Sequence, residues 1–286
     1  MKKLPELGVG LLIHYSEKYK NYLEHVSNDV DFYELLLIHF SENPNAIKRV
    51  KKELKKPLLL HSAAASLATD GPLNEKLVNS MKERIDNADA PWYSEHLCFT
   101  GVSGVQAGTL VLPILTEESL NIICDKISIL NKKIQRPLLI ENVVNMYNDV
   151  GDFTHTEFIN EVLKRTDSKL LLSVENMSMS KRFYPEFDHY KFIDELETSK
   201  IAQIHCPLGN LEEQKITPDS TYGSLEKKQQ LHFDVLDYLA KEKKVKPNAL
   251  VWELETETNS IAEPKDFIKY LEWSKDLFFN KEVIKL

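Results

Sequence analysis

The feature that most constrains the fold is a short apolar run that ends abruptly in a side chain able to bind a metal or take part in catalysis. The clearest example is Arg136-Pro137-Leu138-Leu139-Ile140-Glu141-Asn142, in which apolar residues are followed by a carboxylate and an amide. A buried parallel strand has this continuous apolar character, and the residues after its C-terminal end face the ligand crevice. We interpret the stretch as a buried strand that carries Glu141 to a functional site.

The same pattern recurs along the chain. A single case could be an ordinary strand that ends at a surface glutamate, because loops usually begin with polar residues. Its recurrence indicates a shared architecture. The other runs and their terminal polar residues are 57–60 with His61, 91–96 with Glu95 and His96, 169–174 with Glu175, 201–204 with His205, and 249–252 with Glu253.

The chain alternates between apolar runs and amphipathic segments. We predict strands at 7–13, 30–38, 57–60, 91–96, 137–140, 169–174, 201–205 and 249–253, and helices at 16–25, 44–54, 72–86, 116–133, 154–165, 190–198, 224–244 and 263–278. Eight βα units in strict alternation predict an α/β fold, a (βα)8 TIM barrel, as one domain over residues 1–286. An open doubly wound sheet is the alternative, but no G-x-G-x-x-G follows the first run.

Local signals add detail to this scheme. Thr154 and Glu157 have the spacing of a capping box at the start of a helix. The Gly- and Ser-rich segment 100–113 reads as a long functional loop, and residues 62–66, which have small side chains, read as a loop close to a ligand. Together with 211–223, these loops are where we expect substrate specificity to lie.

Charge and apolar content exclude several classes of protein. The net charge is −8, the pI is near 5.7, and no basic stripe is present, which argues against nucleic-acid binding. No apolar run reaches 18 residues and the N-terminus lacks a signal-peptide core, so we expect no membrane span and a cytoplasmic location. Cys98, Cys124 and Cys206 have no C-x-x-C spacing and read as reduced thiols.

In a barrel all strands end at one rim, so polar residues far apart in sequence converge there. Imidazoles and carboxylates without thiolates favour iron, manganese or zinc. The predicted metal ligands are His61, His96, Glu141, His205 and Glu253. Because Glu141 lies midway between the other ligands along the rim, it is the candidate to bridge two ions.

Each of these residues also has an ordinary interpretation. A lone histidine at a strand end is more often a satisfied polar group, whereas three in equivalent positions favour a metal. Glu95 and His96 are adjacent, so only one can point inward, and we favour His96. His14 ends the first run and could enter the site, while the remaining histidines are interpreted as structural. The predicted catalytic carboxylates are Glu141, Glu95 and Glu175.

Several motifs in order along the chain resemble the multinuclear non-heme iron-dependent oxidase family. They are Leu7-Gly8-Val9-Gly10-Leu11, Pro57-Leu58-Leu59-Leu60-His61, Ser94-Glu95-His96-Leu97, Leu112-Pro113 with Thr116-Glu117-Glu118, residues 136–142, Glu157-Phe158 with Arg165-Thr166, residues 170–176, and Ile204-His205. The resemblance implies a xylose isomerase-like barrel that uses iron and dioxygen to modify cysteine or other residues of ribosomally made peptides, often with a partner protein that presents the peptide.

The sequence also departs from the family pattern. Ser173 stands where the family has an aspartate, Gly209 where it has a second histidine, and Ser220 and Tyr222 where it has an aspartate and a histidine. The remaining ligands suffice for one or two ions, so a third iron is not expected. Glu175 could restore a carboxylate from a shifted position.

Three functions stay open at this point. The first is a metal-dependent oxidase, with iron favoured and zinc or manganese as alternatives, that acts on a peptide. The second is a metal-dependent sugar isomerase or epimerase, or a hydrolase, of the xylose isomerase-like group. The third is a relative with a reduced site that only binds a peptide. The sequence leaves the substrate, the need for a partner protein and the oligomeric state open.

Overall fold

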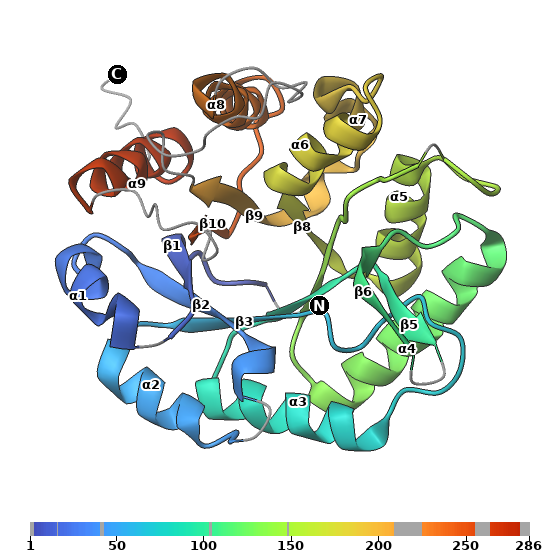
Figure 1. Cartoon of the computed structure of the whole chain (residues 1–286), viewed down its shortest axis with the longest axis horizontal. Coiled ribbons are helices and arrows are strands. Elements are labelled where there is room, and N and C mark those ends of the chain that lie inside the picture. The colour runs from blue at the N-terminus through green and yellow to red at the C-terminus, as the bar shows by residue number, and fades with distance from the viewer. Residues whose placement is uncertain are drawn as a thin grey trace.

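Eight parallel strands close a barrel in the order β1-β10-β9-β8-β7-β4-β3-β2, and helices surround it (Figure 1). The computed structural model describes residues 3–15, 17–40, 43–102, 105–147, 149–208, 225–254 and 264–280. The barrel strands are β1 (Gly8–Ile13), β2 (Phe32–Leu36), β3 (Leu58–Ser62), β4 (Tyr93–His96), β7 (Leu138–Glu141), β8 (Lys169–Ser173), β9 (Ile201–Leu208) and β10 (Ala249–Leu254). The predicted TIM barrel is confirmed.

Helices follow the strands, as the alternation of apolar and amphipathic segments predicts. Their amphipathic faces pack on the outward side chains of the strands, so the layer between strands and helices forms the larger hydrophobic core. They are α1 (Glu17–Val26), α2 (Ala46–Leu54), α3 (Glu75–Ala88), α4 (Glu117–Ile134), α5 (His155–Thr166), α6 (Val174–Phe183), α7 (His189–Glu195), α8 (Leu225–Lys241) and α9 (Pro264–Phe278), with 3-10 turns η1 (Leu37–Phe40) and η2 (Thr198–Lys200).

The inside of the barrel holds a second, smaller core. Its strand residues include Phe32 of β2, Leu59 of β3, Leu139 of β7 and Val251 of β10. Gly10 of β1 borders this core, because a Cβ atom at that position would lie 2.6 Å from the Phe32 ring. Side chains two positions further along a strand share its face. The apolar interior residues therefore determine which polar residues point inward at the rim.

Two regions differ from the predicted pattern. Part of the predicted loop 100–113 forms an antiparallel hairpin, β5 (Phe99–Val102) and β6 (Val105–Val111), because its Val, Leu and Phe residues favour extended backbone despite the glycines. Helix α6 was not predicted and begins directly after β8. Its N-cap is Ser173, whose hydroxyl accepts a hydrogen bond from the Asn176 backbone N–H at 3.2 Å.

The capping box predicted at the start of α5 is confirmed. The Thr154 hydroxyl accepts a hydrogen bond from the Glu157 N–H at 3.3 Å, and the Glu157 carboxylate accepts one from the Thr154 N–H at 2.8 Å. Among the described residues, none of the helices combines the length and apolar character that crossing a bilayer requires.

Candidate metal centre

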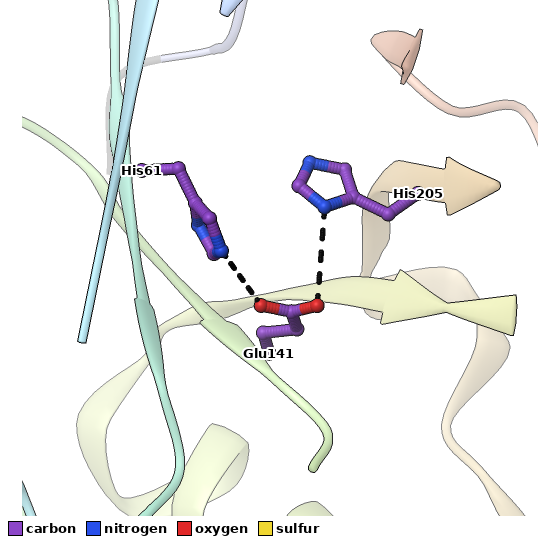
Figure 2. A group of neighbouring side chains, drawn as sticks. All are labelled: His61, Glu141 and His205. Atoms are coloured by element: carbon purple, nitrogen blue, oxygen red, sulfur yellow. Dashed lines mark ion pairs between the residues drawn. The ribbon is translucent and has the colours of Figure 1, made fainter. Parts of the chain in front are cut away.

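Three buried side chains from distant strands meet at the C-terminal rim of the barrel. His61 of β3, Glu141 of β7 and His205 of β9 each offer a ligand atom, and these atoms lie within 4.8 Å of one another. Figure 2 shows both imidazole rings directed at the Glu141 carboxylate. His61 and Glu141 lie two positions after the interior residues Leu59 and Leu139, so strand alternation turns both inward.

Glu141 contacts histidines through both carboxylate oxygens. Its Oε2 atom lies 3.0 Å from His61 Nε2 and 2.9 Å from His96 Nε2. Its Oε1 atom lies 3.8 Å from His205 Nδ1 and accepts a hydrogen bond from Asn176 Nδ2 at 3.3 Å. The two oxygens thus face different histidines, although the His61 and His205 ring centroids lie 5.0 Å apart.

The other ring nitrogens of His61 and His96 are held from outside the cluster. His61 Nδ1 lies 2.7 Å from the Ser94 hydroxyl, and His96 Nδ1 lies 2.9 Å from the Ser62 carbonyl oxygen. Outer hydrogen bonds of this kind fix the ring orientation of metal-binding histidines. The Nε2 atom of each ring is left directed at Glu141.

His205 is held in the same way, but by residues that sequence reasoning missed. Its Nε2 atom lies 2.6 Å from Oε2 of Glu34 in β2, and the Gln203 side chain lies next to both. Its Nδ1 atom lies 3.2 Å from Oε1 of Glu253, the predicted ligand on β10. Glu253 is partly exposed, at the edge of the cluster.

Two atoms at the centre are buried without a hydrogen bond among the described residues. They are Oε2 of Glu141 and Nδ1 of His205. Glu141 Oε2 lies 3.0 Å from His61 Nε2 and 2.9 Å from His96 Nε2, and His205 Nδ1 lies 3.2 Å from Glu253 Oε1. A buried polar atom without such a bond costs free energy unless something else satisfies it. Converging imidazole nitrogens and carboxylate oxygens are the donor set that iron, zinc and manganese accept.

The charged groups of the cluster shift one another's pKa values. Burial raises the pKa of Glu141, but the neighbouring His96 and His61 outweigh it and hold this pKa well below its usual value. Burial lowers the pKa of His96, but the Glu141 carboxylate outweighs it and raises this pKa to about 9. Without a metal, these shifts favour a protonated His96 beside an ionised Glu141. A divalent ion would have to displace this proton.

Glu95 is buried but lies on the opposite face of β4 from His96. Its Oε1 atom accepts a hydrogen bond from the Ala65 backbone N–H at 3.1 Å. Burial raises its pKa to about 7. The structure therefore places His96 and not Glu95 against Glu141, as strand alternation predicts, and Glu95 supports the loop after β3.

Glu175 lies in the first turn of α6, not at the end of a strand. Its Oε2 atom is 3.5 Å from Nε2 of His232 on α8, which also contacts the Ser178 hydroxyl at 3.0 Å. Glu175 is absent from the group of three mutually close ligand atoms among the described residues. Ser173, where the sequence resemblance implies a carboxylate, caps α6.

Other predicted positions lie apart from the cluster or cannot be placed. The His14 ring lies against the His39 ring at a tilt, with ring centroids 4.5 Å apart, and is not part of the group around Glu141. Gly209, Ser220 and Tyr222 fall outside the described residues.

The sequence carries a signal for two residues that contact the cluster, Glu34 and Asn176. Glu34 is the one charged residue in the apolar stretch 32–38, and it follows Phe32 by two positions. Alternation therefore turns it inward. Asn176 follows the predicted strand at 169–174, but its contact with Glu141 depends on the turn of α6, which was not predicted.

A cavity of about 610 Å³ adjoins the cluster on the side of His61 and His96. The segment after β3 contributes Ala63 and Ala64, and the hairpin strand β6 contributes residues 108–110. The predicted loop at 62–66 therefore does border the site. A side chain bound in this cavity would lie next to the two histidine rings.

Comparisons with known proteins identify chains that are similar to this one. A family model described as RiPP precursor modification enzyme MbnB/TglH/ChrH matches residues 6–277. A UPF0276 protein of Caulobacter vibrioides (strain NA1000 / CB15N) is 28% identical over 190 residues, which cover 65% of this chain and 68% of that protein.

Solved structures match the fold over nearly the whole chain. D-psicose 3-epimerase, crystallised in the presence of D-fructose, matches with a TM-score of 0.62 and 11% identity, covering 96% of this chain and 100% of that one. A xylose isomerase domain containing protein from Salmonella typhimurium LT2 matches with a TM-score of 0.54 and 12% identity, covering 98% and 100%. At these identities the likeness concerns the barrel alone.

Proposed function

The chain belongs to the RiPP precursor modification enzyme family MbnB/TglH/ChrH, and from this membership we propose that it oxidises a residue, such as a cysteine, of a ribosomally made peptide. The family, which the sequence resemblance had identified, supports a peptide-modifying metalloenzyme. Our proposal adds that the metal is iron, with one or two ions per chain, and that dioxygen is the oxidant.

The observation that carries the proposal is the surroundings of Glu141. Its Oε2 atom faces His61 and His96, while its Oε1 atom is nearest to His205. His61 and His96 would hold one ion on the Oε2 side of Glu141. His205 and Glu253 would hold a second ion on the Oε1 side. A carboxylate with ligands on both sides is suited to bridge, which supports the role expected for Glu141.

The protein residues have separable roles in this proposal. The outer partners of the histidines hold each ring with one nitrogen directed inward, so little reorganisation is needed when metal binds. In this proposal the peptide residue would bind in the cavity beside His61 and His96. Iron and dioxygen together would supply the oxidising equivalents.

Glu95 is the described carboxyl best suited to hold a proton near the site, since burial raises its pKa to about 7. It lies behind His96, so we assign it to the support of the site and not to direct contact with the substrate. Glu175, which faces His232, receives a supporting role for the same reason.

A second candidate function is a metal-dependent sugar epimerase or isomerase. The barrel match to D-psicose 3-epimerase favours it, and Ser173 leaves one carboxylate fewer than the oxidase pattern has. A single ion that polarises a carbonyl would suffice for this chemistry. A site reduced to peptide binding is less favoured, because buried charges are costly when unpaired.

The test is performed on protein purified without oxygen. Its metal content is measured first, and dioxygen uptake is then followed after addition of a cysteine-bearing peptide, with the matched serine peptide as control. Uptake that depends on both iron and cysteine, together with a mass change of the peptide, supports the proposal. One zinc or manganese ion without dioxygen uptake would favour the epimerase alternative.

A further inference from the structure

A chain of hydrogen bonds crosses the inside of the barrel and ends at His205. It links Trp92, which precedes β4, to Gln203 on β9, then to Glu34 on β2 and finally to His205, and all four side chains are fully buried. We propose that Trp92, Gln203 and Glu34 are positioning residues that hold His205 with its Nδ1 atom free toward Glu141. The proposal deepens the proposed function and rests on it for the role of His205 as a ligand.

The first link fixes the orientation of the Gln203 amide. An indole N–H can only donate, so the amide atom 2.7 Å from Trp92 Nε1 must be the carbonyl oxygen Oε1. The amide nitrogen of Gln203 is therefore turned away from Trp92 and toward β2. No other assignment of the amide satisfies the indole.

The second link fixes the Glu34 carboxylate. Gln203 Nε2 lies 3.0 Å from both Oε1 and Oε2 of Glu34 and donates to them. A buried carboxylate is costly unless donors surround it. The amide thus holds the plane of the carboxylate and leaves Oε2 directed at the His205 ring.

The third link fixes which nitrogen of His205 carries a proton. The 2.6 Å contact between His205 Nε2 and Glu34 Oε2 requires a proton between the two atoms. The amide nitrogen of Gln203 cannot accept this proton, because that nitrogen is itself a hydrogen-bond donor. With Nε2–H committed to Glu34, the lone pair available for a ligand bond is on Nδ1, the atom that faces Glu141 and Glu253.

Interior positions on other strands carry apolar residues such as leucine, alanine, valine and phenylalanine. Replacing a buried ionic group by a well-packed apolar residue is often neutral or stabilising, so stability alone does not explain these polar groups. Trp252 provides a comparison, because its indole N–H is satisfied by the Ser274 hydroxyl of α9 at 3.1 Å, outside the barrel. The interior network is therefore a device for orienting His205.

The experiment compares Trp92→Phe with Trp252→Phe. Each substitution removes one buried indole N–H and leaves an aromatic ring, but only the first disconnects Gln203. The zinc affinity of each full-length variant is measured by competition with a chelator. Trp92→Phe and Glu34→Gln are expected to weaken zinc binding by roughly 10- to 100-fold, and Trp252→Phe to leave it unchanged. Equal affinities of the two tryptophan variants would overturn the proposal.

A second readout needs neither bound metal nor activity. In metal-free protein labelled with 15N-histidine, the Nε2–H proton of His205 is expected to give a far-downfield, slowly exchanging NMR signal that shifts in Trp92→Phe and is lost or strongly shifted in Glu34→Gln. A His205 ring without a protonated Nε2 would overturn the proposal. If both readouts behave as expected but no peptide is oxidised, the proposed function fails and the positioning role stands.

Discussion

At the scale of single residues, the structure combines two kinds of histidine with little exposure. His61, His96 and His205 lie against carboxylates, and the pKa values of His96 and His205 are raised by them although burial alone would lower them. His155, at the start of α5, packs against the Phe192 ring at 5.3 Å, and neither ring nitrogen has a hydrogen-bond partner among the described residues. Burial lowers its pKa to about 4.

His155 therefore makes the stability of the fold depend on pH. Below pH 6.5 the unfolded chain binds a proton at this residue, whereas the folded chain does not until about pH 4. Stability is thus lost as the pH falls through this window, and one such group accounts for about 2 kcal/mol at pH 5 relative to pH 7. We expect His155→Phe to remove this part of the pH dependence, measured by urea unfolding at both pH values.

The readout for His155 is the difference between the two pH values, because a change in packing made by phenylalanine affects both equally. If the variant loses as much stability between pH 7 and pH 5 as the natural chain does, His155 is not held neutral by burial.

The residues of the site differ in how far the sequence could reveal them. His61, Glu141 and His205 were predicted because each ends an apolar run, and a barrel brings such ends together. Glu34 lies inside an apolar run, and its role depends on the geometry of Gln203 and Trp92 across the barrel. Contacts between strands distant in sequence are set by register and closure, which no local pattern encodes.

At the scale of secondary-structure elements, the start of α5 has the capping box that its local sequence predicts. Thr154 and Glu157 satisfy each other's backbone donors, as their spacing predicts. Thr154→Ala should lower the free energy of unfolding by about 1 kcal/mol, while Thr154→Ser, which keeps the hydroxyl, should stay close to the natural value. Urea denaturation measures both, and an alanine variant as stable as the serine variant would contradict the capping role.

The hairpin and α6 show why other elements were missed. The segment 100–113 contains glycines and serines that are typical of loops. Strands β5 and β6 nevertheless pair there, and their pairing contains a register shift. Helix α6 begins at Val174, directly after Ser173 ends β8, so no turn residues separate the two elements. A pattern of apolar runs therefore misses element boundaries that lack turn-forming residues.

The cavity between the segment after β3 and the hairpin gives a test of where the peptide binds. Ala64 lines this cavity, whereas Ala107 on β6 is exposed and does not. We expect Ala64→Trp to lower the rate of peptide modification by roughly 10- to 100-fold without loss of bound metal, and Ala107→Trp to have little effect. Turnover followed by peptide mass, with metal content measured alongside, separates the two. Equal rates would place the peptide elsewhere.

At the scale of the whole molecule, closure of the barrel is what turns scattered residues into a site. Pairing of β10 with β9 brings Glu253 within 3.2 Å of His205, and pairing of β1 with β10 joins the first and last strands of the barrel. The barrel itself was predictable, because eight apolar runs alternate with amphipathic segments. The partners that orient each ligand were not, since they depend on which strands become neighbours.

The central claim is that Glu141 holds metal between two sets of ligands. Its most direct test is the metal content of protein purified without oxygen, compared between the natural chain, Glu141→Gln and Glu83→Gln, an exposed control on α3. We predict one or two iron ions per chain in the natural protein and in the control, and none in a folded Glu141→Gln variant. Full metal occupancy in Glu141→Gln, or no metal in the natural chain, would contradict the account.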